Sequence, residues 1–148
     1  MKLSKNFSLE EMTKSQTALR KGLDNSPSPH HVTCLELLCE HVLQPIRDHF
    51  DRPVTITSGY RSPELCAAIG SKITSQHTKG QAADFEIPGV SNMEVAEYIR
   101  DNLDFDQLIL ECYTGGNTGW IHCSYVHEPR KDVLTYDKDN GYRKGLIA

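Results

Sequence analysis

Residues 75–87 read SQHTKGQAADFEI, a polar loop that turns into an apolar strand pattern. His77 lies in the loop, Gly80 marks the turn, and Asp84 interrupts the apolar pattern of the strand at 81–87. An ionised carboxylate in a strand that packs on a core costs free energy unless a cation or hydrogen-bond donors compensate it. A solvent-facing aspartate and an ordinary loop histidine would also explain this stretch. His77 and Asp84 are therefore candidate functional residues that need support from elsewhere in the chain.

A predicted β-hairpin supplies further candidates. Strand patterns at 105–113 and 120–125 flank residues 114–119, whose sequence TGGNTG is typical of a hairpin loop. The expected register opposes three pairs: Tyr113 with Trp120, Cys112 with Ile121, and Glu111 with His122. Directly opposed residues of antiparallel strands lie on one face, with Cβ atoms about 4.5–5.5 Å apart. A slip of one residue would put Glu111 and His122 on opposite faces.

The residue types at these positions suggest a metal site. Two histidines and one carboxylate are a common ligand set for catalytic zinc, which keeps a fourth position for water. His77, Asp84 and His122 would supply such a set. A nearby carboxylate that is not a ligand can act as general base toward that water, and Glu111 has the expected position. On spacing alone, Glu111 could equally be the cross-strand partner of a protonated His122.

The rest of the chain predicts an α+β fold with a mostly antiparallel sheet packed against helices. Residues 29–50 have apolar positions at helical spacing, and Pro45 should kink or end this helix. A strand at 53–58 and a helix at 91–103 follow from their own patterns. The C-terminal segment 126–148 is polar and rich in turn residues, and its sequence carries little information about structure or role.

Three motifs resemble those of the zinc D-alanyl-D-alanine carboxypeptidase family. SQHTKGQAAD matches the family pattern Ser-x-His-x-x-Gly-x-Ala-x-Asp, GWIHCSY resembles the motif of the last ligand, and SGYRSPEL resembles the Ser-Gly-(Tyr/Phe)-Arg-(Ser/Thr) segment. They occur in the family's order over residues 54–125. The chain looks most similar to small phage-encoded or prophage-encoded members. The resemblance implies the hedgehog/DD-peptidase fold, with residues 1–148 as a single zinc peptidase domain.

The resemblance also implies roles for individual residues. One zinc ion would be held by three ligands: His77, Asp84 and His122. Arg61 would bind substrate and stabilise the transition state, because a guanidinium offers a planar fork of donors to a carboxylate or oxyanion. A surface arginine that caps a turn is the simpler interpretation. Ser75 matches the motif serine and should form hydrogen bonds around the substrate site rather than act as a nucleophile, and Trp120 is a candidate substrate contact.

One position departs from the family pattern. Many relatives have an acidic residue or a histidine two or three positions before the last ligand, where this chain has Trp120 and Gly119. Neither can act as a general base, so Glu111 on the adjacent strand is the best-placed substitute. His127 is a weaker alternative, and Asp106 is weaker still because it should lie on the opposite face of its strand.

The expected activity is hydrolysis of amide bonds in the stem peptides of bacterial peptidoglycan. A D-Ala-D-Ala carboxypeptidase and an L-Ala-D-Glu endopeptidase, for example in an endolysin, both fit these residues. The expected fold resembles that of the hedgehog signalling domain, in which a zinc site of this type supports a binding module. A non-catalytic, zinc-stabilised binding module is therefore an alternative. A phage structural protein that holds the cell wall is another. Glu111 favours the enzyme, because a pure binding module needs no general base.

Composition argues against several other classes of function. The 148 residues carry a net charge of −4, which disfavours non-specific nucleic-acid binding. No apolar run reaches the roughly 20 residues of a membrane helix, and no signal peptide is apparent. We therefore expect no membrane insertion and a cytoplasmic site of synthesis, with a phage holin as one route to the wall. The five cysteines lack a CxxC pair, which predicts reduced, mostly buried thiols.

Overall fold

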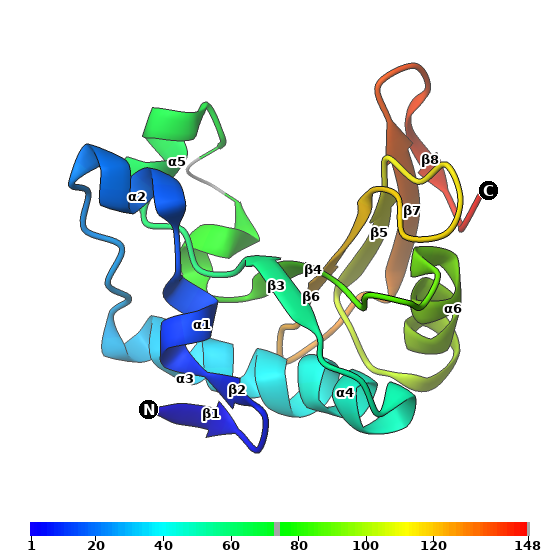
Figure 1. Ribbon diagram of the computed structural model, residues 1–148, viewed down its shortest axis with the longest axis horizontal. Coiled ribbons are helices and arrows are strands. Elements are labelled where there is room, and N and C mark those ends of the chain that lie inside the picture. Colours follow the sequence, from blue (N-terminus) through cyan, green and yellow to red (C-terminus); the bar gives the residue numbers. More distant parts are fainter. Residues whose placement is uncertain (73–74, 148) are drawn as a thin grey trace.

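The computed structural model describes residues 1–72 and 75–147 (Figure 1). Its elements follow in this order: β1 (Lys2–Ser4), β2 (Phe7–Ser8), α1 (Leu9–Thr13), α2 (Gln16–Lys21), α3 (Pro29–Leu38), η1 (Cys39–Leu43), α4 (Gln44–Phe50), β3 (Thr55–Ser58), α5 (Pro63–Ile69), η2 (Gln76–Lys79), β4 (Ala82–Glu86), α6 (Asn92–Asn102), β5 (Gln107–Glu111), β6 (Trp120–Ser124), β7 (Asp132–Asp137) and β8 (Gly141–Lys144). None of the helices in these two described stretches combines the length and the apolar character that crossing a bilayer requires.

A six-stranded sheet forms the centre of the fold, with the strand order β3-β4-β6-β5-β7-β8. Every neighbouring pair is antiparallel except β5 and β7, which run parallel. The helix α6 packs against β5 and β6. In Figure 1, α5 lies at the opposite end of the molecule from β8. The expected α+β architecture with a mostly antiparallel sheet is confirmed.

The two faces of the sheet differ because successive residues of a strand point to opposite sides. One face is apolar and belongs to the core that the helices complete; its fully buried members are Ala83, Phe85, Leu108, Leu110, Ile121 and Cys123. Burying each large apolar side chain stabilises the fold by about 1.5–3 kcal/mol. This burial fixes which side of each strand faces the core, so the alternate residues Asp84, His122 and Glu111 share the opposite face.

The helical segment at 29–50 continues past Pro45 rather than ending there. A proline lacks the N–H that would bond four residues back, and its ring crowds the preceding turn. The π-helical turn η1 lies immediately before it, where the Gln44 N–H donates to the carbonyl of Cys39, five residues earlier. This wider turn accommodates the ring. The segment therefore stays helical as α3, η1 and α4.

The hairpin of β5 and β6 has a register two residues away from the expected one. Glu111 pairs with Trp120, and His122 pairs with Ile109. The strand ends at Glu111 because Cys112 takes a left-handed conformation with φ 55°, which starts the loop earlier. A shift of two residues keeps every side chain on its face. Glu111 and His122 therefore remain on one face. They are diagonal neighbours, with Cα atoms about 7–8 Å apart, rather than a directly opposed pair.

The C-terminal segment carries more structure than its sequence predicts. Residues Asp132–Asp137 form β7, which pairs in parallel with β5 and opposes Tyr136 to Glu111. The next strand, β8, opposes Tyr142 to Tyr136. The short N-terminal hairpin of β1 and β2 was likewise not predicted. The consequence for the site is that β7 and β8 extend its polar face by two strands.

Candidate metal centre

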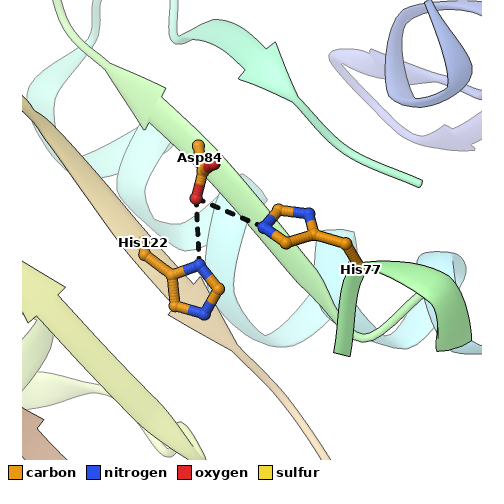
Figure 2. A group of neighbouring side chains, drawn as sticks. All are labelled: His77, Asp84 and His122. Atoms are coloured by element: carbon orange, nitrogen blue, oxygen red, sulfur yellow. Dashed lines mark hydrogen bonds and ion pairs between the residues drawn. The ribbon is translucent and has the colours of Figure 1, made fainter. Parts of the chain in front are cut away.

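Three side chains that are distant in sequence meet on the polar face of the sheet (Figure 2). His77 comes from η2, Asp84 from β4 and His122 from β6, where it pairs directly with Asp84. Asp84 Oδ1 lies 2.9 Å from His122 Nδ1 and 3.4 Å from His77 Nε2. Each residue offers one atom that could ligate a metal ion, and these three atoms lie within 4.8 Å of one another. The fold thus brings together the three ligands expected from the sequence.

Local hydrogen bonds set the orientation of the His77 ring. Ser75 Oγ accepts the backbone N–H of His77 where η2 begins, and Gly80 ends this turn with φ 71°. A Cβ on Gly80 would press on the backbone carbonyl of His31, so the motif needs glycine here. His77 Nδ1 lies 2.7 Å from the carbonyl oxygen of Gly59. Because a carbonyl can only accept, Nδ1 carries a proton, and Nε2 is the ring nitrogen that faces the cluster.

Asp84 is a buried carboxylate whose charge is compensated on both sides. Burial raises the pKa of Asp84, but the hydrogen bonds from His122 and His77 outweigh burial and hold the pKa well below its usual range. On the other side, Arg61 Nη2 lies 3.2 Å from Asp84 Oδ2, and Arg61 Nε donates to Ser58 Oγ at 2.7 Å. One carboxylate oxygen therefore faces the two imidazoles, while the guanidinium fixes the other.

The donor set fits a divalent ion such as zinc. Two imidazole nitrogens and a carboxylate oxygen are usual zinc ligands, and catalytic zinc sites have three protein ligands with one position left open. Within residues 1–72 and 75–147, no fourth histidine, cysteine or carboxylate joins the group. The contacts of His77 with Gly59 and of Arg61 with Asp84 are the kind of outer hydrogen bonds that orient metal ligands. His77, Asp84 and His122 are thus a possible metal site.

Glu111 lies on the same face as this group but is not part of it. Its Oε2 accepts the indole N–H of Trp120 at 2.9 Å. Burial raises the pKa of Glu111, and the negative charge of Asp84 raises it further. The positive charge of His122 and the Trp120 hydrogen bond lower it, without cancelling the rise. A carboxyl group with a raised pKa is suited to proton transfer near neutral pH.

The metal cluster opens into a cleft of about 750 Å³. Its lining includes the three expected metal ligands and the preferred candidates for substrate binding and catalysis: Arg61, Ser75, His77, Asp84, Glu111, Trp120 and His122. A smaller cleft of about 440 Å³ lies on the other side of Arg61 and includes no member of the cluster. The larger cleft is therefore the candidate substrate site.

Several residues support the site in ways that the sequence did not predict. Asp106 is buried just before β5, where it accepts two hydrogen bonds from the guanidinium of Arg130 and one from Gln76, the neighbour of His77. It is thus an ion-pair partner that ties η2 to the sheet. Tyr136 and Tyr142 line the cleft from β7 and β8. The sequence signal for this pair was weak, because each tyrosine follows only a short, mixed pattern.

The remaining candidates lie away from the cluster. His127 is exposed and does not line the cleft.

All five cysteines are free thiols, and Cys39, Cys66 and Cys123 are buried. This agrees with the reduced, mostly buried thiols that the cysteine spacing predicts.

The α+β fold thus presents two imidazoles and a carboxylate as a possible metal site in one cleft, with a glutamate on the same face. Comparison with protein families matches residues 5–124 to the family described as Peptidase M15. Because this match covers most of the chain, the protein belongs to the M15 family of metallopeptidases. A search of curated proteins returned no match. The family assignment and the six-stranded sheet agree with the hedgehog-like fold that the three sequence motifs imply.

Proposed function

We propose that this protein is a zinc peptidase that hydrolyses amide bonds in the stem peptides of bacterial peptidoglycan. The observation that carries the proposal is the convergence of His77, Asp84 and His122 in one cleft with a carboxylate of raised pKa, Glu111, beside them. Membership in the M15 family supports the peptidase activity. The motif resemblance supports the peptidoglycan substrate.

Each residue has a role that its position allows. Zinc, when held by the three ligands, supplies Lewis acidity that polarises a carbonyl and makes water more acidic. Glu111 accepts the proton of the attacking water and passes it to the leaving amine. Arg61 orients Asp84 through Nη2 and, at the rim of the cleft, attracts a substrate carboxylate or the developing oxyanion. Trp120 holds the Glu111 carboxylate in place.

Metal analysis and hydrolysis test the proposal together. The purified protein should contain about one equivalent of zinc and should release soluble fragments from purified peptidoglycan. Chelation should stop the release, and added zinc should restore it. A protein that binds zinc but leaves every wall preparation intact would rule out the peptidase and favour the zinc-stabilised binding module of the same fold.

The cleaved bond follows from the masses of the products. Free D-alanine identifies a D-Ala-D-Ala carboxypeptidase, whereas a sugar carrying a single alanine identifies an L-Ala-D-Glu endopeptidase. An endolysin-like role is part of the same proposal. Expression inside a bacterial host should then cause lysis only when a holin-type pore former is co-expressed, and the Glu111→Gln variant should not lyse the cells under either condition.

A further inference from the structure

The polar face of the sheet presents its chemistry in a defined sideways order. Starting from the β3 edge, Arg61 precedes the metal ligands on β4 and β6, Glu111 follows on β5, and two tyrosines follow on β7 and β8. All of these groups line the same cleft. A substrate that lies across the strands therefore meets a cation at one end and two aromatic rings at the other.

The aromatic end consists of Tyr136 and Tyr142, directly opposed across β7 and β8. Their ring centroids lie 4.6 Å apart with an interplanar angle of 45°, and Tyr142 is 62% exposed. An aromatic pair of this kind, with Tyr142 exposed and Tyr136 half-buried, offers flat apolar faces with hydroxyl groups at their rims. Both residues follow the stretch 5–124 that the family comparison matches.

We propose that Tyr136 and Tyr142 form a subsite for a pyranose ring, the N-acetylated amino sugar to which the stem peptide is attached. This inference rests on the proposed peptidoglycan substrate and deepens it. A pyranose has a flat C–H face that stacks on an aromatic ring and polar edges that suit a wet, open cleft. The lining of the cleft is otherwise mostly polar, with Gln107 and Glu111 among its members. An aliphatic side chain would instead favour an enclosed apolar pocket.

The spacing of the strands agrees with a cleavage point close to the sugar. Tyr136 lies two strands and two residues away from His122, which places their Cα atoms about 12 Å apart. From an L-Ala carbonyl, the alanine and the lactyl linker together span about 7 Å, because each has the length of one residue. The sugar ring then begins within stacking reach of the tyrosines. A D-Ala-D-Ala bond is about five residues from the sugar, so an extended stem would carry the ring past β8.

The cationic end completes the orientation. Arg61, which contacts Asp84 on β4, lines the cleft on the side away from the tyrosines, and it would attract the free α-carboxylate of the D-glutamate that follows L-alanine. The acyl side of the substrate then points to the aromatic pair and the amine side to Arg61. The subsite thus favours cleavage between L-alanine and D-glutamate.

Matched ligands test the sugar subsite directly. One is the tripeptide L-Ala-γ-D-Glu-L-Lys carrying N-acetylmuramic acid, and the other is the same tripeptide capped with acetyl. The zinc-loaded protein should show a higher kcat/KM for the first. Tyr142→Ala should lower that value about tenfold and change the value for the acetyl peptide less than twofold. Tyr142→Trp should keep the preference. Lys138→Ala, at the exposed turn of the same hairpin, is the matched control.

Binding is measured separately from hydrolysis. Trp120 is the only tryptophan in the chain and lines the cleft, so its fluorescence follows ligand binding to the Glu111→Gln protein. Hydrolysis of both peptides with no preference, or an equal loss on both in Tyr142→Ala, would overturn the subsite and leave the peptidase intact. Sugar-dependent binding that Tyr142→Ala abolishes, in a protein that cleaves nothing, would uphold the subsite and reject the peptidase. Absence of both signals would overturn both.

Discussion

The indole N–H of Trp120 donates a hydrogen bond of 2.9 Å to Glu111 Oε2 across two directly paired residues of β5 and β6. Trp120 lies at a position where many relatives have an acidic residue or a histidine. Glu111 is the carboxylate that we propose as the general base instead, and the hydrogen bond joins the two residues. It holds the carboxylate on the face of the sheet that carries His122 and Asp84. The geometry explains how a tryptophan before the last ligand is compatible with a proton-transfer site.

Replacement of Glu111 by glutamine should separate metal binding from turnover. The amide retains the size and an acceptor for Trp120 but cannot take a proton. We expect kcat to fall about 10²–10⁴-fold, the range of general acid–base catalysis, with zinc content unchanged. Metal analysis and steady-state kinetics on the same preparation provide the measurement. Near-normal kcat in Glu111→Gln would remove this residue from the mechanism.

Trp120→Phe should move the acid limb of the pH profile upward. The hydrogen bond from Trp120 stabilises the ionised form of Glu111 and so lowers a pKa that burial has raised. Losing it raises that pKa further, so activity that requires ionised Glu111 is lost at a higher pH than in the native protein. A hydrogen bond to a charged group is worth about 1.5–3 kcal/mol, so the shift should be on the order of one pH unit. An unchanged kcat/KM profile would speak against the base assignment.

Zinc should stabilise the folded protein through the two histidines. A ligand that binds only the folded state at 100 times its Kd adds about 2.7 kcal/mol to the free energy of unfolding. Chelation should lower the melting temperature accordingly, and added zinc should raise it again. His77→Ala and His122→Ala should abolish the response. The exposed His127 lies outside the cleft, so His127→Ala is the control and should respond like the native protein.

Asp84→Asn should show a pH-dependent loss of stability in the metal-free protein. The pKa of Asp84 in the folded state lies below its ordinary value of 3.8, so its charge stabilises the fold above that value. This stabilisation is lost as the pH falls through the lowered pKa, where the carboxylate of the native protein is protonated. The difference in unfolding free energy, about 1–3 kcal/mol at neutral pH, should therefore shrink in strong acid. Denaturation at several pH values in chelator gives the comparison, and a constant difference would contradict this assignment.

Gly119→Ala should disturb the position of Glu111. Gly119 has φ 68°, and an added Cβ would overlap the backbone carbonyl of Glu111 and the backbone of Cys112. We expect a loss of about 2 kcal/mol or more in stability together with reduced activity. Gly116→Ala is the matched control, since Gly116 also has a left-handed φ, of 56°, but has no atom within 4 Å of the added Cβ. Equal effects of the two variants would assign the loss to backbone strain alone.

The metal ligands could be predicted from local sequence patterns, whereas the hydrogen bonds that orient them could not. His77 and Asp84 stand in one short stretch, and His122 stands in a strand whose apolar alternation fixes its face. The period of two also kept Glu111 on the correct face, although the hairpin register was wrong by two residues. That register depends on Cys112, which ends the strand in a conformation that its sequence does not signal.

The sequence alone determined the α+β class and the residue types of the metal site, because apolar periodicity and short motifs are local properties of the chain. Only the tertiary structure decided which side chains support that site. The contact of Arg61 with Asp84 joins two separate elements, and the two tyrosines reach the cleft because β7 pairs in parallel with β5. Such neighbours depend on pairing between distant strands, and that pairing follows from burial of the whole sheet rather than from any one segment.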